Sequence, residues 1–527
     1  MKLRNHLLVL HPFLFTLFPI FSLYANNLGE VPFWSVLRAL AVGLLACGVA
    51  LALLRLMIGE WHRAGLAATL AGLLFFTFGR ANQFLQESGW LVTAEGQRPL
   101  ALLAAWGLVF AAGVLWIARR PAPPRGATRL LNALSGIALV TCLYGFAAYG
   151  VQTVQAGSID RKEPTEIPVP RTGRGSPTAG PSISYPDIYY IILDGYTRSD
   201  VLSELYGVDN TPFLDYLRGE GFYVASESRS NYAQTALSLA SSLNFNYLGA
   251  KMELVPELAD RGPLHELIND NDLIRFLKAQ GYTSVAFSNG FPVTEMTEAD
   301  QLIKAGEGLN NFEISLLSSS LGGLELDEQI IDSYRQRILD TETELQTLVR
   351  EPKSVPGPRF VFVHLIVPHP PFIFQRDGSP RQSLDGGDGS HFTGEEADYR
   401  EGYREQVQFA SLLAERMIAD ILEHSAEPPV ILLQGDHGSG MHLEWDSVEE
   451  SCLRERLSIL NAYYLPGRDA EKLLHPGITP VNSFRVVLNA YFNARLPLLP
   501  NRSYFSLWEQ PYDLQDVSES IEASCAQ

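Results

Sequence analysis

The sequence predicts a two-part protein: an N-terminal α-helical bundle of five membrane spans, followed by an α/β domain with a doubly wound, mostly parallel sheet. Charge divides the chain. Residues 1–150 hold 11 basic and 4 acidic residues, and the rest of the 527-residue chain holds 29 basic and 55 acidic residues. In the second part, short apolar runs that end on polar residues alternate with helical patterns, which is typical of a parallel sheet.

Five apolar stretches approach the ~20 residues that a spanning helix needs. They are residues 7–25, 33–55, 64–79, 99–118 and 130–149, the third being the shortest. Lys2 and Arg4 precede the first stretch as in a signal peptide, but no small-x-small cleavage site follows it. We therefore expect the first stretch to stay in place as an anchor.

Basic residues indicate the orientation of the spans. If the chain crosses the membrane five times from a cytoplasmic N-terminus, only Arg38, Arg80 and Arg98 lie near the outer face of the membrane. Eight basic residues then lie near the inner face: Lys2, Arg4, Arg55, Arg63, Arg119, Arg120, Arg125 and Arg129. We expect a multi-pass protein of the cytoplasmic membrane with an extracytoplasmic C-terminal domain. That domain is too acidic to bind nucleic acid nonspecifically.

Residues 151–186 are rich in Pro, Gly and Ser and are predicted to form a linker. The outer domain is expected at 187–510, with a C-terminal tail at 511–527. Its expected elements, in chain order, are strand 188–193, helix 273–279, strand 282–287, helix 327–350, strand 360–367, helix 395–424, strand 430–433 and strand 459–465. Cys452 and Cys525 either pair in an oxidising compartment or stay free.

Three of these runs end near residues that can bind a metal or a phosphate, and parallel strands bring their carboxyl ends together. Asp194 follows the first run, His369 the second, and Asp436 with His437 the third. Thr235 opens a helical segment whose N-terminus favours negative charge. A divalent cation held by Asp194, Asp436 and His437 would lower the pKa of the Thr235 hydroxyl and make it a nucleophile.

Three histidines are interpreted from their neighbours in the sequence. His369, between prolines, is expected to contact substrate or to move a proton. His364 lies inside its strand and is expected to be buried. His442 follows the Gly-Asp-His-Gly segment and is expected to bind substrate or a second metal, with either choice left open.

Together these motifs resemble the sulfatase-like branch of the alkaline phosphatase superfamily. They are Leu193-Asp-Gly, the threonine-headed helix, His369-Pro-Pro-Phe, Gly435-Asp-His-Gly and Tyr464-Leu-Pro-Gly. Five spans before an outer domain also resemble lipoteichoic acid synthases and related phosphoglycerol and phosphoethanolamine transferases. The resemblance implies one Mn²⁺, Mg²⁺ or Zn²⁺ ion, with Thr235 as both nucleophile and ligand beside Asp194, Asp436 and His437. It also implies that His369 contacts the transferred phosphoryl group.

This sequence departs from the family patterns in two places. Lipoteichoic acid synthases usually have glutamate where this chain has Asp194. Sulfatases need Cys or Ser in C/S-x-P-x-R, whereas this chain has Thr235-Ala-Leu-Ser-Leu, so sulfate ester hydrolysis is not expected. The resemblance favours transfer from a membrane phospholipid donor to a glycan or lipid acceptor through a phosphothreonine. A metal-dependent phosphodiesterase or phosphatase and a non-catalytic sensor module are the alternatives.

Overall fold

A computed structural model of the protein describes residues 9–87, 97–156, 185–381 except 253, 307, 325, 352–354 and 356, then 394–523 and 525. The chain forms two compact units. The first contains residues 1–155 together with 309–330, and the second contains residues 156–308 together with 331–527. The first unit therefore includes a segment of 22 residues whose neighbours in the chain belong to the second unit.

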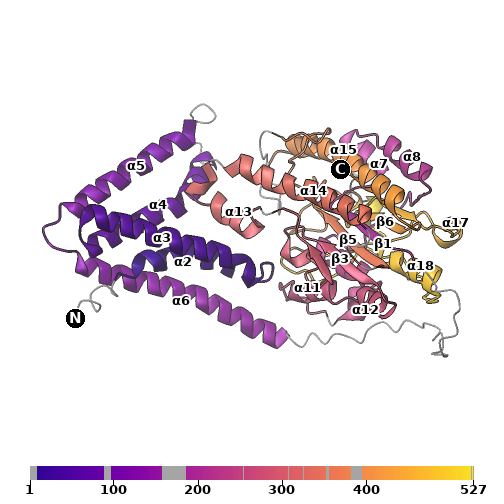
Figure 1. The fold of residues 1–527 in the computed structure, drawn as a ribbon, viewed down its shortest axis with the longest axis horizontal. Helices are drawn as coiled ribbons and strands as arrows, with labels where there is room; N and C mark the ends of the chain where they lie inside the picture. The colour runs from indigo at the N-terminus through magenta and orange to yellow at the C-terminus, as the bar shows by residue number, and fades with distance from the viewer. Residues whose placement is uncertain are drawn as a thin grey trace. The chain divides into compact units, whose positions relative to one another are not determined.

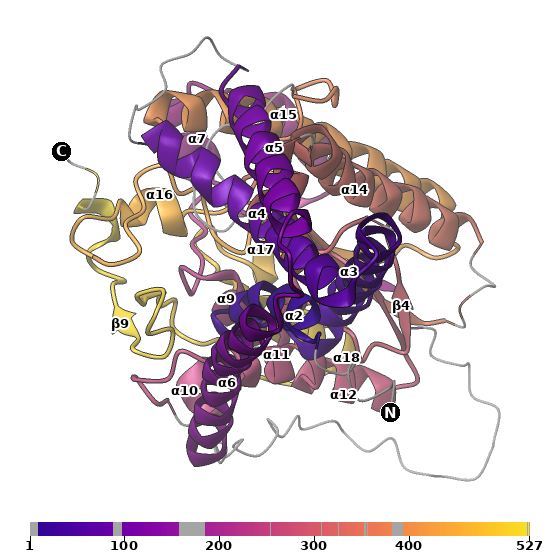
Figure 2. The same cartoon turned by 90° about the vertical axis from the view of Figure 1, so that its left-hand side faces the viewer.

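The N-terminal unit is helical (Figures 1 and 2). Four of its described helices are long and apolar enough to cross a membrane, and α2 has 15 residues. The expected third span, 64–79, is longer than predicted because α4 has 27 residues. Part of the expected first span lies outside the described residues. The helices are α2 His11–Ala25, α3 Leu37–Ile58 after the short η1 Phe33–Val36, α4 Trp61–Glu87, α5 Gln97–Ala118 and α6 Arg125–Ala156.

Residues 309–330 belong to this helical unit although both of their chain neighbours lie in the other one. The segment contains α13 (Asn311–Ser318) and η3 (Leu321–Leu324). Arg38, at the start of α3, donates two hydrogen bonds to Glu313, one of them 2.6 Å long. A Cβ at Gly79 of α4 would collide with the Ser318 carbonyl. The segment also shares an apolar cluster with the helices, formed by Ile20, Val36, Ala39, Phe312 and Leu316.

The second unit is built on a sheet of seven strands in the order β2-β7-β6-β1-β5-β3-β4. The central pairs are parallel, as predicted, with β1 between β5 and β6. β7 runs antiparallel to β6 and to β2, in a sheet that is mostly parallel as predicted. The strands are β1 Ile188–Leu193, β2 Tyr223–Val224, β3 Thr283–Phe287, β4 Gln301–Ile303, β5 Arg359–Leu365, β6 Val430–Gln434 and β7 Asn461–Tyr464.

Helices cover both faces of the sheet, so β1, β5 and β6 are buried throughout (Figure 1). One face packs against α11, α12 and α18, and the other lies under α14 and α15. The helices are α7 Ser199–Tyr206, α8 Thr211–Gly219, α9 Thr235–Leu243, α10 Leu248–Lys251, α11 Gly262–Asn269, α12 Asp272–Ala279, α14 Leu326–Arg350, α15 Glu396–His424, α16 Leu453–Leu457, α17 Ala470–Leu473 and α18 Pro480–Phe492.

Two predicted boundaries are corrected by the structure. The linker was expected from residue 151, but α6 continues to Ala156, and residues 157–184 lie outside the described residues. The tail expected at 511–527 is part of the second unit. Its strand β9 (Gln515–Asp516) pairs with β8 (Tyr504–Phe505), η4 (Ile521–Ala523) packs near α16, and Cys525 forms a disulfide with Cys452.

Candidate active site

The carboxyl ends of β1, β5 and β6 bring the predicted site residues together. The Asp194 N–H donates to Leu365 O at 2.9 Å, which joins the ends of β1 and β5. The Gly195 N–H donates to Asp436 Oδ1 at 3.0 Å, which joins the end of β1 to the loop after β6. Gly195 has φ +75°, a conformation that favours glycine and that lets the chain turn directly after Asp194.

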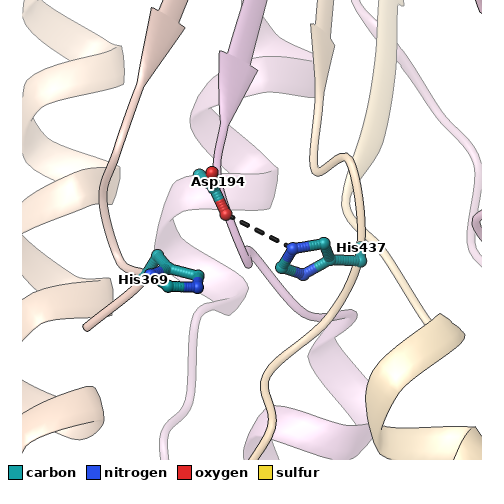
Figure 3. A group of neighbouring side chains, drawn as sticks. All are labelled: Asp194, His369 and His437. Atoms are coloured by element: carbon teal, nitrogen blue, oxygen red, sulfur yellow. Dashed lines mark ion pairs between the residues drawn. The ribbon is translucent and has the colours of Figure 1, made fainter. Parts of the chain in front are cut away.

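Asp194, His369 and His437 surround one point (Figure 3), and one ligand atom from each lies within 4.8 Å of the others. His437 Nε2 is 3.4 Å from Asp194 Oδ1 and 3.3 Å from Asp436 Oδ2. These two carboxylate oxygens are buried, and neither has a hydrogen-bond partner among the described residues. Buried carboxylate oxygens without donors are the arrangement that a divalent cation completes.

Hydrogen bonds determine which nitrogen of each imidazole carries its proton. His437 Nδ1 lies 2.8 Å from Gly438 O, and His369 Nδ1 lies 2.6 Å from Pro370 O. Because a carbonyl only accepts, each Nδ1 carries the proton and donates it. Each Nε2 therefore keeps its lone pair, as in histidines that bind a metal.

Thr235 is the first residue of α9, as predicted, and its Oγ1 lies 3.0 Å from His437 Nε2. The strand that ends before Asp436 and the helix that begins at Thr235 are held together by two serines. Ser230 Oγ and Ser238 Oγ both donate to Asp436 O, at 2.5 and 2.8 Å. The Thr235 hydroxyl therefore lies in one site with Asp194, His369, Asp436 and His437, which we call the candidate metal-binding group.

The charges in this site depend on one another. Burial raises the pKa of Asp194. The neighbouring His369 and the hydrogen bond with His364 outweigh burial and hold this pKa below its ordinary value. Burial and the charge of Asp194 raise the pKa of Asp436. Burial also lowers the pKa of His369 and of His437, so both rings are neutral near pH 7. Two adjacent carboxylates with neutral imidazoles have the composition of a divalent cation site.

Two further residues support the site, and no sequence motif predicts the role of either one. His364 Nδ1 lies 2.8 Å from the Asn289 amide nitrogen and must accept, so its Nε2–H donates to Asp194 Oδ2 at 3.1 Å. Its position inside β5 suggested only burial. Arg456, on α16, is buried and donates to Ala233 O and Gly438 O at 2.8 and 3.3 Å. An arginine on a five-residue helix carries no recognisable pattern.

His442 lies apart from the candidate metal-binding group. Its Nδ1 is 3.0 Å from Glu455 Oε2, and its Nε2 is 3.7 Å from Glu396 Oε1. Its predicted binding of substrate or of a second metal stays a prediction. A cavity of about 650 Å³, which Gly195, His369 and Arg456 help to line, opens at the site.

The profile of the family described as Sulfatase matches residues 186–470. No curated protein matches the chain. Among solved structures, the chain is similar to the C-terminal periplasmic domain of EcEptC from Escherichia coli, at 13% identity over 64% of this chain and 93% of that one, with a TM-score of 0.42.

It is also similar to the integral membrane protein lipooligosaccharide phosphoethanolamine transferase A from Neisseria meningitidis, at 14% identity over 92% of this chain and 94% of that one, with a TM-score of 0.42. The C-terminal periplasmic domain of phosphoethanolamine transferase EptC from Campylobacter jejuni is similar at 15% identity over 59% of this chain and 90% of that one, with a TM-score of 0.36.

Proposed function

The chain belongs to the sulfatase family of enzymes, and we propose that it is a membrane-anchored, metal-dependent transferase that moves a phosphoryl headgroup from a phospholipid to a glycan or lipid acceptor. The observation that carries the proposal is the Thr235 hydroxyl, 3.0 Å from His437 Nε2 and beside two buried carboxylates. Threonine at this position, without the formylglycine motif, favours phosphoryl over sulfate transfer.

The chemistry proceeds in two displacements. Thr235 Oγ attacks the phosphorus, a Thr–O–P bond forms, and the P–O bond to diacylglycerol breaks. Thr235 gives up its hydroxyl proton, which His369 Nε2 accepts and then passes to the departing alkoxide. An acceptor hydroxyl then attacks the same phosphorus, and the bond between Thr235 Oγ1 and phosphorus breaks. The acceptor's proton passes to Thr235 Oγ1 by way of His369.

A divalent cation, held by Asp194, Asp436, His437 and Thr235, supplies positive charge that lowers the hydroxyl pKa and stabilises the phosphoryl oxygens. Mn²⁺, Mg²⁺ and Zn²⁺ all suit this set of carboxylate and imidazole ligands. The apolar helices in the same chain support a lipid donor, because an enzyme that stays in the bilayer meets such a donor at high effective concentration.

Release of diacylglycerol by the full-length protein, in vesicles of phosphatidylglycerol and phosphatidylethanolamine, tests this function. Thr235→Ala should lower the rate by about 10³-fold or more, and Thr235→Ser should keep part of it. Normal release by Thr235→Ala would exclude the mechanism. Release that needs no acceptor and yields free phosphoester would identify a hydrolase instead of a transferase.

We also propose that the catalytic unit lies outside the cytoplasmic membrane. Residues 309–330 continue at both ends into the catalytic unit, and they contact Arg38 and Gly79. These ends of α3 and α4 must therefore face the catalytic side of the bilayer. These helix ends lie on the membrane face that has three basic residues, and the opposite face has eight. The positive-inside rule makes the face with fewer basic residues the outer one.

Thiol labelling of spheroplasts tests this orientation. An impermeant maleimide should label a cysteine at exposed Asn26 and should not label one at exposed Ala122, with the parent protein as background control. The reverse pattern would contradict the orientation.

A further inference from the structure

The cavity beside the candidate active site has an aromatic wall. Trp445 and Trp508 both line it, and their ring centroids are 5.0 Å apart. A guanidinium also lies near each of the two rings. Arg456 lies 5.1 Å from the Trp445 ring, and Arg261 lies 4.1 Å from the Trp508 ring. The aromatic wall is therefore fixed in place before a ligand enters, and its remaining surface can contact an organic cation.

Four exposed carboxylates line the same cavity. Glu396 is paired with Arg400, and the other three are Glu444, Asp446 and Glu509. Within the described part of the chain, none of the three forms an ion pair with Lys, Arg or His. We call them the rim carboxylates. Their negative charge favours a positive group on the ligand and opposes one that carries a net negative charge.

Ser439 adds an independent sign of a ligand. It lines the cavity, it is only 2% exposed, and its Oγ has no hydrogen-bond partner among the described residues. A buried hydroxyl is normally satisfied, because an unmade hydrogen bond is costly. His369 and the rim carboxylates line the same cavity, so a ligand that satisfies Ser439 enters the space that they share.

We propose that this cavity selects a substrate with a protonated amine beside its phosphoryl group. Carboxylates accept hydrogen bonds from N–H groups, and the tryptophans attract the same cation. A zwitterionic headgroup meets no net repulsion at the rim, whereas an anionic phosphoglycerol headgroup does. The inference deepens the proposed function and rests on it, since the phosphoryl group is the one that Thr235 attacks. The amine belongs either to the donor headgroup or to an amino sugar of the acceptor.

Calorimetry on the full-length Thr235→Ala protein with Mn²⁺ tests the selection without turnover. O-Phosphoethanolamine should bind roughly tenfold more tightly than glycerol 1-phosphate, because only O-phosphoethanolamine has an amine that can pair with the rim carboxylates. The triple variant Glu444→Gln, Asp446→Asn, Glu509→Gln should lose this preference. Its affinity for glycerol 1-phosphate should be at least as high as before, because the charge that repels an anion is removed. A charge-matched control, Glu220→Gln, Glu257→Gln, Glu471→Gln, replaces exposed carboxylates that do not line the cavity and should keep it.

Equal affinities for the two phosphoesters, or a preference that survives in the rim variant, would overturn the proposal. The source of the amine follows from the wild-type protein in mixed vesicles without acceptor. A phosphoethanolamine adduct on Thr235 assigns the amine to the donor, and a glycerophosphoryl adduct with the binding preference intact assigns it to the acceptor. No adduct at all, with that preference intact, would count against the proposed transferase and leave amine selection standing.

Discussion

Thr235 Oγ1 lies 3.0 Å from His437 Nε2, although 202 residues separate the two in the chain. The contact joins the first residue of α9 to the loop after β6. It places a hydroxyl against the imidazole that also faces both Asp194 and Asp436. The fold therefore assembles a nucleophile and a cation site from segments that are unrelated in sequence.

The purified protein should hold about one equivalent of divalent cation, as a site with this donor set does. Asp436→Asn should weaken cation binding by about 100-fold, because it removes the charge of a ligand whose Oδ2 is otherwise unpartnered. Asp209→Asn, at an exposed carboxylate, is the matched control. Competition with a chelator measures both affinities, and equal values for the two variants would contradict the assignment.

His364 should matter for cation binding without being a ligand. Its Nε2–H holds Asp194 Oδ2, so His364→Ala frees the carboxylate to rotate and should lower cation affinity about 10- to 100-fold. His364→Gln, which can still donate, should recover part of the loss. If His364→Ala bound the cation as tightly as the wild type, Asp194 would not depend on this hydrogen bond.

The ion pair between His442 and Glu455 predicts a pH-dependent stability. The hydrogen bond to Glu455 raises the pKa of His442 above 6.5. Burial raises the pKa of Glu455, but the hydrogen bonds that Glu455 accepts, first the one from His442, bring that pKa below 4.5. The histidine contribution is complete below pH 6.5 and disappears as pH rises through the raised pKa. The glutamate contribution is complete above pH 4.5 and disappears as pH falls through the lowered pKa.

His442→Gln should therefore lower Tm most between pH 4.5 and 6.5, by about 2 °C for a unit of this size, and less at higher pH. His475→Gln, at an exposed histidine, serves as the control. Thermal unfolding at several pH values measures the difference. A loss of Tm that is constant with pH would mean that the pair does not titrate as described.

The Cys452–Cys525 disulfide should stabilise the catalytic unit, because it closes a loop across 73 residues and joins the last described segment to the start of α16. Its removal should cost about 2–4 kcal/mol. Cys525→Ala should lower Tm and make it insensitive to reductant, whereas Cys47→Ala, which removes a free thiol, should leave the effect of reductant unchanged. Unfolding with and without reductant measures this, and no change on reduction would argue against a stabilising bond.

Local patterns predicted the strands and their polar ends correctly, because buried strands and long helices impose a period on their own residues. These patterns place Asp194, His369, Asp436 and His437 after strands and Thr235 at the start of a helix, and the roles of the five residues stay predictions. Tertiary contacts were not predictable in the same way. The docking of α13 on the helical unit depends on Arg38, which lies 275 residues before its partner Glu313. The antiparallel direction of β7 and the roles of His364 and Arg456 likewise depend on neighbours that no local pattern encodes.

The most direct test of the central claim is the mass of the Thr235 peptide. The full-length protein is incubated with Mn²⁺ and phospholipid vesicles, without acceptor, and then digested. A phosphodiester headgroup on Thr235, absent from Thr235→Ala and removed when acceptor is added, is the predicted result. An unmodified Thr235 in a protein that holds its cation and releases diacylglycerol would contradict the account.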